Sequence, residues 1–228
     1  MTLSRRDLEE GRMRALYIAT TADPRLALTD AQLAESLRKT LARRPADAGW
    51  WVFAYGSLLW NPLFPFAESQ PATVRGYHRR FCLWSLASRG TTTLPGLVLG
   101  LDRGGTCHGV VYRLPARCAR AELKLLWRRE MVTGAYDPRW MRVRAGHDTL
   151  TALTFVVDRR HRQYAGQLSN AEAISVLATA QGALGSSADY LERTRVALIS
   201  HGIVDPYLEK LAARVAAQRR LQPMEGFS

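Results

Sequence analysis

A glutamate near the end of one predicted helix is well placed for acid–base chemistry. The helix, expected from about Cys118 to Met131, carries an apolar stripe formed by Leu123, Leu126 and Trp127. Glu130 continues this stripe one turn later, whereas Arg128 and Arg129 are expected to point elsewhere. Burial removes water from a carboxylate and raises its pKa, which suits a general base near neutral pH. The spacing is also compatible with a structural role, in which Glu130 lies at a frayed helix end or pairs with a core arginine.

A tight Gly-Ser turn is the second feature that could bind a reacting group. The short apolar run Trp51–Ala54 predicts a buried strand, and it stops at Gly56-Ser57 between aromatic residues. Gly56 would let backbone N–H groups approach a ligand closely, and Ser57 would add a hydroxyl donor. An ordinary strand-ending turn would have the same sequence, so this pattern alone leaves both interpretations open.

The region that positions these residues is rich in short β-type runs. We expect strands at 51–54, 73–84, 96–101, 106–114, 140–144 and 150–158. The sequence Asp102-Arg103-Gly104-Gly105 predicts a hairpin turn between two of them. One helix interrupts the strands and several helices follow them, an order that favours an α+β fold over a doubly wound parallel sheet.

The two ends of the chain are predicted to be helical. A capping box at Thr29 begins a helix that ends before Pro45, and an earlier helix is expected from Ser4 to about Ile18. Towards the carboxyl end we expect helices after a second capping box at Ser169, from Ser186 to His201, and after Asp205-Pro206. We therefore predict a helical extension at residues 1–49 and a main domain at residues 50–228.

The excess of positive charge is distributed rather than concentrated. The chain has 32 basic and 20 acidic residues, a net charge of +12, and only Lys39, Lys124 and Lys210 are lysines. This preference for arginine can reflect coding composition as easily as a binding surface. Because no nucleic-acid motif accompanies it, we expect no nucleic-acid partner, and the charge would favour encounter with a small anionic substrate.

Several function classes find no support in the sequence. The three cysteines and five histidines show no metal-ligand spacing, and no phosphate-binding glycine loop or G-x-S-x-G elbow occurs. We therefore expect neither a metal nor a nucleotide cofactor. No apolar run reaches the ~18 residues of a membrane span, and residues 1–10 do not resemble a secretory signal. These features predict a cytoplasmic protein with reduced thiols and no membrane partner.

Several motifs in one order resemble the ChaC family of γ-glutamylcyclotransferases. The resemblance includes the Y-G-S-L signature and the R-E-M element, which here continues into Thr133-Gly134-x-Tyr136. The matching segments are Tyr55–Leu58, Tyr77–Phe81, Gly109–Pro115, Trp127–Met131 and Ala188–Leu191. Spaced matches in a common order, from about Trp50 to Leu211, are far more specific than any single motif.

The resemblance implies a fold, an activity and a set of site residues. The fold would be a small mixed β-barrel surrounded by helices. The activity would be that of a lyase that converts glutathione to 5-oxoproline and cysteinylglycine without a cofactor, because the substrate's own α-amine is the nucleophile. Glu130 would be the catalytic acid/base, and Tyr190 would line the substrate pocket. The γ-glutamyl group would bind to Tyr55, Gly56, Ser57 and Leu58.

Three residues depart from the family pattern, and two other functions remain open. Ala54 stands where glycine is common, Leu97 where relatives usually have arginine, and Ser187 where bacterial relatives tend to have asparagine. The last two could alter substrate contacts in the pocket.

Two other functions remain compatible with the sequence. They are a cyclotransferase for another γ-glutamyl amide or amine, and a non-catalytic regulatory binding protein.

Overall fold

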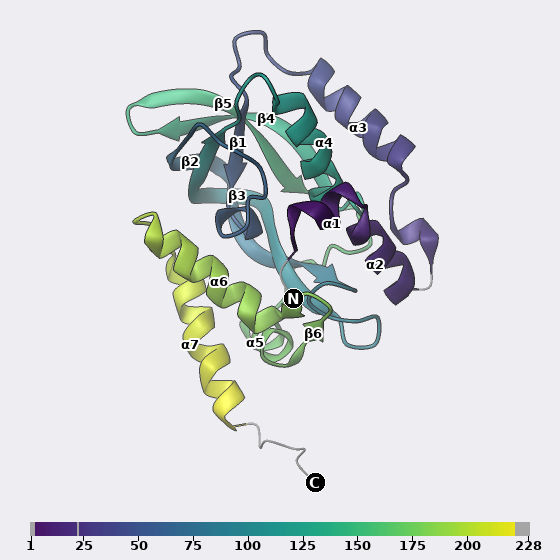
Figure 1. Cartoon of the computed structure of the whole chain (residues 1–228). Helices are drawn as coiled ribbons and strands as arrows, with labels where there is room; N and C mark the ends of the chain where they lie inside the picture. Colours follow the sequence, from purple (N-terminus) through teal and green to yellow (C-terminus); the bar gives the residue numbers. More distant parts are fainter. Residues whose placement is uncertain (1–2, 22, 222–228) are drawn as a thin grey trace.

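A closed five-stranded barrel forms the centre of the molecule (Figure 1). This computed structural model describes residues 3–21 and 23–221. The strands are β1 (Trp51–Ala54), β2 (Glu68–Ser85), β3 (Gly96–Arg113), β4 (Tyr136–Ala145) and β5 (Asp148–Val157). Their order is β1-β3-β2-β4-β5, and a parallel β1–β5 pair closes an otherwise antiparallel sheet. The predicted α+β class with a mixed β-barrel is confirmed.

The barrel closes around large apolar side chains. Phe53 of β1, Phe81 of β2 and Phe155 of β5 are fully buried, and Trp127 packs edge-on against Phe155 from outside the sheet. Burying each of these rings contributes about 1.5–3 kcal/mol of hydrophobic stabilisation. Strand β1 is therefore held rigidly up to the residue before Tyr55, where the functional turn begins.

The predicted hairpin turn at residues 102–105 is wrong. These residues lie inside β3, which runs without a break where two separate strands were expected, and the chain reverses at residues 86–95 instead. Gly104 and Gly105 have φ values of +98° and +69°, and the register of β2 against β3 shifts beside them. Glycines with positive φ serve β-bulges as well as turns, so this sequence signal was misassigned.

The described part of the amino-terminal region contains three α-helices rather than two. They are α1 (Arg5–Glu9), α2 (Arg12–Thr21) and α3 (Asp30–Ala42), with a short 3₁₀ helix η1 at Pro24–Leu26. The single helix expected from Ser4 to Ile18 is interrupted because Gly11 has a φ of +68°. Helix α3 begins with the predicted capping box at Thr29 and ends before Pro45, as predicted.

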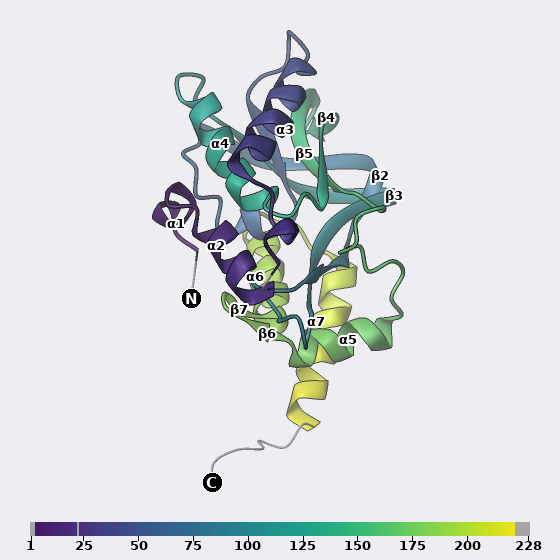
Figure 2. The ribbon, with the colours of Figure 1, turned by 90° about the vertical axis from the view of Figure 1, so that its right-hand side faces the viewer.

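The remaining helices cover two sides of the barrel. Helix α4 (Ala119–Glu130) packs beside α3, where the Trp127 indole donates a hydrogen bond to the Ser36 hydroxyl (3.3 Å). The helices α5 (Asn170–Thr179), α6 (Ser187–Ser200) and α7 (Pro206–Leu221) gather at the other end (Figure 2). Between α5 and α6 lies the small hairpin of β6 (Gln181–Gly182) and β7 (Gly185–Ser186). The three predicted carboxyl-terminal helices are therefore present.

The division into an extension at 1–49 and a domain at 50–228 stays a prediction. Its outer ends, residues 1–2 and 222–228, lie outside the described residues. Across the described part of the chain, every helix is too short or too polar to cross a membrane.

Candidate active site

Two cavities that share lining residues lie between the barrel, α4 and the start of α6. Their volumes are about 130 Å³ and about 20 Å³. The smaller one is bounded by the turn after β1, and the larger one extends towards the amino-terminal helices. The shared lining residues are Ser57, Glu130, Tyr136 and Tyr190.

Glu130, the last residue of α4, presents a poorly hydrated carboxylate to both cavities. Its side chain is only 13% exposed, and Oε1 is buried with no hydrogen-bond partner in the described structure. Burial raises the pKa of Glu130 above its ordinary value, and the nearby Arg129 charge opposes that rise. The Arg129 Nε lies 3.0 Å from Oε1. A desolvated carboxylate with one cationic neighbour fits the predicted acid/base role.

The expectation that Arg129 points away from the buried side of the helix is wrong. Arg129 is 8% exposed and lines the larger cavity beside Glu130. Its guanidinium donates one hydrogen bond to Ser57 Oγ (2.9 Å) and another to the Asn61 carbonyl oxygen. The helical stripe did not predict this position, because the turn after β1 covers a second face of α4. Arg129 thus joins the glutamate to the turn.

The turn after β1 exposes backbone donors to the cavity. Residues Ser57–Leu59 form a 3₁₀ turn, η2, in which the Leu59 N–H donates to the Gly56 carbonyl (2.9 Å). Among described residues, the N–H groups of Ser57 and Leu58 have no hydrogen-bond acceptor. The first N–H groups of such a turn are left unpaired by geometry, and they attract negatively charged oxygen atoms.

Two tyrosine hydroxyls are held by the barrel rather than by the turn. Tyr55 donates to the Phe155 carbonyl (2.7 Å), and Tyr136 donates to the Leu99 carbonyl (3.0 Å). Burial raises the pKa of both phenols well above the ordinary value. Both therefore stay neutral and form the wall of the small cavity, which Leu58 also lines.

Tyr190 of α6 lies directly over Gly56. A Cβ on Gly56 would approach the Tyr190 hydroxyl oxygen to 2.9 Å, closer than side chains tolerate. The Tyr190 ring packs edge-on against Trp60 and Phe81, and burial raises the pKa of its hydroxyl to about 12. The turn thus requires glycine where the tyrosine covers it.

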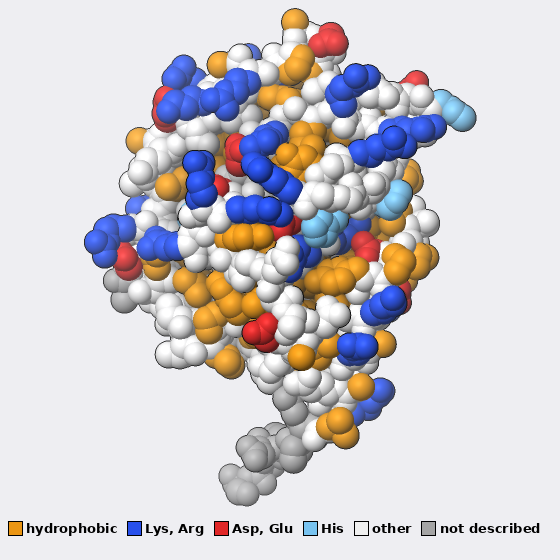
Figure 3. All heavy atoms as spheres, turned by 180° about the vertical axis from the view of Figure 1, so that it is seen from behind, with side chains coloured by type: hydrophobic (Ala, Val, Ile, Leu, Met, Phe, Trp, Pro, Cys, Tyr) orange, Lys and Arg blue, Asp and Glu red, His pale blue; other side chains and the backbone are white. Residues whose placement is uncertain are grey.

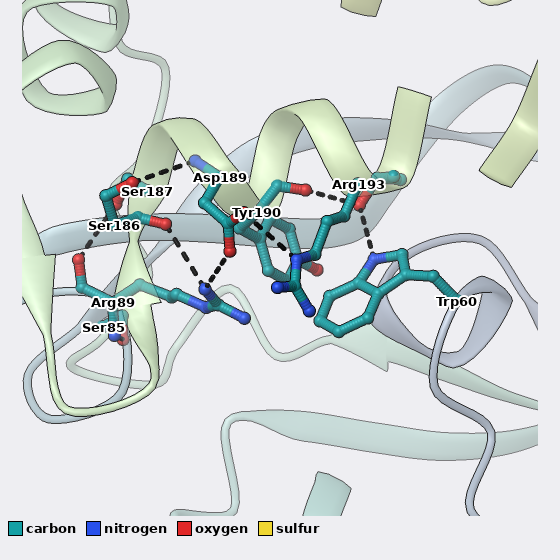
Figure 4. A network of polar contacts seen from close by, with 9 residues as sticks. Trp60, Ser85, Arg89, Ser186, Ser187, Asp189, Tyr190 and Arg193 are labelled. Atoms are coloured by element: carbon teal, nitrogen blue, oxygen red, sulfur yellow. Dashed lines mark hydrogen bonds and ion pairs between the residues drawn. The ribbon is translucent and has the colours of Figure 1, made fainter. Parts of the chain in front are cut away.

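A buried arginine, Arg89, lies beside Tyr190 in the larger cavity (Figure 4). Its Nη1 donates to Asp189 Oδ2 (3.2 Å) and to the Ser186 carbonyl (3.4 Å). The guanidinium carbon lies 5.5 Å from the centre of the Tyr190 ring. Burial lowers the pKa of Arg89, while the neighbouring Asp189 carboxylate opposes this change. The cavity therefore contains a second cation, distant in sequence from Arg129.

The two departures that could alter substrate contacts, Leu97 and Ser187, have different surroundings. Leu97 is fully buried in the apolar core and is absent from the lining of both cavities. Ser187 Oγ donates to the Arg89 carbonyl (3.1 Å) and accepts from the Leu97 N–H (3.1 Å). Ser187 thus fixes the backbone of the loop that carries Arg89.

Every residue predicted for the site lies at one of these cavities. Tyr55, Gly56 and Leu58 line the smaller one, whereas Ser57, Glu130 and Tyr190 line both. Their individual roles stay predictions. Sequence reasoning missed Arg89, Arg129 and Gln163, which also line the larger cavity, and it quoted Tyr136 only as part of a motif. No local pattern pointed to Arg89 or Gln163, because loop packing alone brings them here.

Within residues 3–21 and 23–221, no group of three or more His, Cys, Asp or Glu side chains could hold an ion.

Comparison with known proteins assigns the chain to a family. The family described as ChaC-like protein matches residues 50–218. The chain is 43% identical over 185 residues to a glutathione-specific gamma-glutamylcyclotransferase of Escherichia coli, covering 81% of this chain and 80% of that protein. It is 35% identical to glutathione-specific gamma-glutamylcyclotransferase 1 of Mus musculus, covering 63% and 66%.

A solved structure supports the same assignment at the level of the fold. The crystal structure of a gamma-glutamyl cyclotransferase specific to glutathione from yeast superposes with a TM-score of 0.71 and 23% identity, over 78% of this chain and 100% of that one. Because the family match covers residues 50–218 and the Escherichia coli relative is 43% identical, the chain belongs to the ChaC-like protein family.

Proposed function

We propose that this chain is a glutathione-specific γ-glutamylcyclotransferase that releases 5-oxoproline and cysteinylglycine. The observation that carries the proposal is the shared cavity of Glu130 and the Gly56–Ser57 turn, which combines a desolvated carboxylate with unpaired backbone donors. The identity to the Escherichia coli protein over most of both chains supports the same activity.

The chemistry is an intramolecular substitution at the γ-carbonyl carbon. The α-amine of the γ-glutamyl group, which is mostly protonated at neutral pH, first loses a proton to the Glu130 carboxylate. Its nitrogen lone pair then forms a bond to the γ-carbon, and the carbonyl electrons move to oxygen. When that carbonyl reforms, the bond to the cysteine nitrogen breaks. After attack the ring nitrogen carries two hydrogens and a positive charge. Glu130 gives its proton to the cysteine nitrogen as the C–N bond breaks, and it then passes the second proton of the ring nitrogen to the released amine. The products are a neutral lactam and an ammonium group, and the carboxylate ends in its starting state.

The turn would bind the charge that develops on the substrate. The N–H groups of Ser57 and Leu58 and the hydroxyl of Ser57 can hold either the developing oxyanion or the α-carboxylate. Arg129 positions this turn, because one of its hydrogen bonds fixes the orientation of Ser57 Oγ.

Ordinary catalytic contributions are sufficient for such a reaction. Proton transfer through a positioned carboxylate contributes about 10²–10⁴-fold in rate. Holding the amine against the γ-carbonyl supplies up to ~7–11 kcal/mol in well-oriented systems. No group outside the protein and the substrate takes part in any of these steps.

The thiols and the surface charge bear on the location and partners of the enzyme. We infer a cytoplasmic location, because reduced glutathione and free thiols such as Cys82 and Cys107 both belong to a reducing compartment. We infer no nucleic-acid partner. On the face shown in Figure 3, basic side chains alternate with acidic and apolar ones instead of forming one basic surface.

The test is product analysis with purified protein. Incubation with reduced glutathione should release 5-oxoproline and cysteinylglycine in equal amounts, and faster than 5-oxoproline from other γ-glutamyl amides or γ-glutamylamines. Preference for another γ-glutamyl compound would keep the reaction and change the substrate. Absence of 5-oxoproline from every compound would contradict the enzymatic proposal and favour a regulatory binding protein.

A further inference from the structure

One wall of the larger cavity comes from outside the part of the chain that matches the family. Leu3, Met13 and Tyr17, all within residues 3–21, line this cavity, whereas the family match begins at residue 50. None of these three residues lines the smaller cavity beside the turn. The amino-terminal segment therefore shapes only one side of the site.

Polar contacts fix this segment onto the catalytic domain. Arg5 donates to both carboxylate oxygens of the buried Glu122 on α4 (2.7 and 3.0 Å). Asn61, which accepts a hydrogen bond from Arg129, donates its own amide to the Leu3 carbonyl (2.9 Å). Figures 1 and 2 both place α1 and α2 beside α4. The wall is thus a docked part of the fold.

Tyr17 also connects the segment to the loop that carries Arg89. Tyr17 packs in one apolar cluster with Ala87, and its hydroxyl lies near the Ser85 side chain. Ser85 Oγ in turn accepts a hydrogen bond from the Arg89 N–H (2.9 Å). The extension and the Arg89 loop are therefore parts of one packed unit at the far side of the larger cavity.

The order of the two cavities indicates which part of the substrate meets this wall. The turn bounds the smaller cavity, Glu130 and Ser57 lie where the two cavities share residues, and the extension bounds only the larger one. The scissile amide must lie beside Glu130, and the γ-glutamyl group lies on the turn side of it. The remainder of the substrate then extends into the larger cavity.

The chemistry of this cavity matches a cysteinylglycine unit. That dipeptide offers one weakly polar side chain and one carboxylate. The cavity offers an apolar surface, which includes Leu3 and Met13, and the buried cation Arg89. Of the Arg89 nitrogens, Nε and Nη2 make no hydrogen bond with any described residue, so they remain available to a carboxylate.

We propose that the larger cavity is the leaving-group subsite, in which Arg89 binds the glycine carboxylate and the amino-terminal segment, through Leu3 and Met13, contacts the cysteine side chain. This inference rests on the proposed cyclotransferase function. It gives the extension a role in substrate selection that the family match does not contain.

The carboxylate contact is tested by comparing glutathione with its glycine monoethyl ester. Arg89→Gln should lower kcat/KM for glutathione by about tenfold or more, because a charge-assisted hydrogen bond is lost. The ester has no glycine carboxylate, so its kcat/KM should fall by a much smaller factor in Arg89→Gln. The ratio of the two kcat/KM values is independent of how much of the variant is folded. An unchanged ratio would overturn the assignment of Arg89 to the leaving group.

The apolar wall is tested with glutathione and S-methylglutathione. Met13→Ala opens space beside the cysteine side chain, so S-methylglutathione should gain several-fold in kcat/KM relative to glutathione. Leu16→Ala is the matched control, since Leu16 packs in the same apolar cluster without lining the cavity. Equal ratios in Met13→Ala and wild type would overturn the role of the wall.

Failure of the enzymatic activity and failure of the leaving-group subsite give different results in these experiments. Wild-type protein that releases no 5-oxoproline from glutathione contradicts the proposed function and the subsite with it. Wild-type activity combined with unchanged substrate ratios in both variants contradicts the subsite alone.

Discussion

Gly56 and Tyr190 form a matched pair at the substrate turn. The tyrosine hydroxyl oxygen lies only 2.9 Å from the position that a Cβ on residue 56 would occupy. The next nearest atom, Leu99 Cβ, is 3.7 Å away and at ordinary contact distance. Among the nearest atoms, only the tyrosine oxygen lies closer to that position than ordinary contact distance.

This contact predicts a strong coupling between two substitutions. Gly56→Ala should destabilise the protein by about 1–3 kcal/mol, because the Tyr190 ring is packed between Trp60 and Phe81 and cannot move freely. A Tyr190→Phe background lacks the oxygen, so Gly56→Ala should lower the free energy of unfolding there by a clearly smaller amount. Urea unfolding of the four variants measures the coupling. Equal losses in both backgrounds would show that another contact excludes the alanine.

The ion pair between Arg129 and Glu130 predicts that substitution of Arg129 shifts the pH dependence of the reaction. Glu130 must be ionised to accept a proton, so kcat/KM falls as the pH drops through the pKa of Glu130. Burial raises that pKa and the Arg129 charge lowers it. Arg129→Gln removes the lowering effect, so the acidic limb of the profile should move to higher pH.

The control for this shift is Arg129→Lys, which keeps a positive charge near the carboxylate. Its acidic limb should stay closer to that of the wild type. A limb that does not move in Arg129→Gln, or that moves to lower pH, would remove Arg129 from the electrostatics of the base.

The two hydrogen bonds of Ser187 predict an effect on stability. Ser187→Ala would leave the Arg89 carbonyl and the Leu97 N–H without their buried partner, which costs about 1–3 kcal/mol. The exposed Ser175 of α5 provides the matched control, since Ser175→Ala removes no described hydrogen bond of that side chain. Similar urea midpoints for the two variants would indicate that Ser187 does not hold the loop.

Local signals predicted the parts of the fold that local chemistry determines. The capping boxes at Thr29 and Ser169 begin helices in the structure, and the apolar stripe of α4 carries Glu130 to the cavity. The glycine pair at 104–105 was misassigned because positive φ is shared by hairpin turns and by the bulge that β3 contains.

The rest of the site depends on packing between distant segments. Arg129 lies outside the apolar stripe of its helix, and it is buried only because the turn after β1 and residue Asn61 cover it. Arg89 and Gln163 lie on loops whose paths no periodicity fixes. The contribution of residues 3–21 to the cavity arises from tertiary contacts such as Arg5–Glu122, separated by 117 positions.

The most direct test of the central claim is the turnover of Glu130→Gln with reduced glutathione. The amide keeps the size of the side chain and removes the base, so release of 5-oxoproline should fall by at least about 10²-fold with the fold intact. Ser57→Ala keeps the backbone donors, so its rate of 5-oxoproline release should fall by a smaller factor. Glu192→Gln, at an exposed position of α6, should release 5-oxoproline at the rate of the wild type. Release of 5-oxoproline by Glu130→Gln at a rate near that of the wild type would contradict the account.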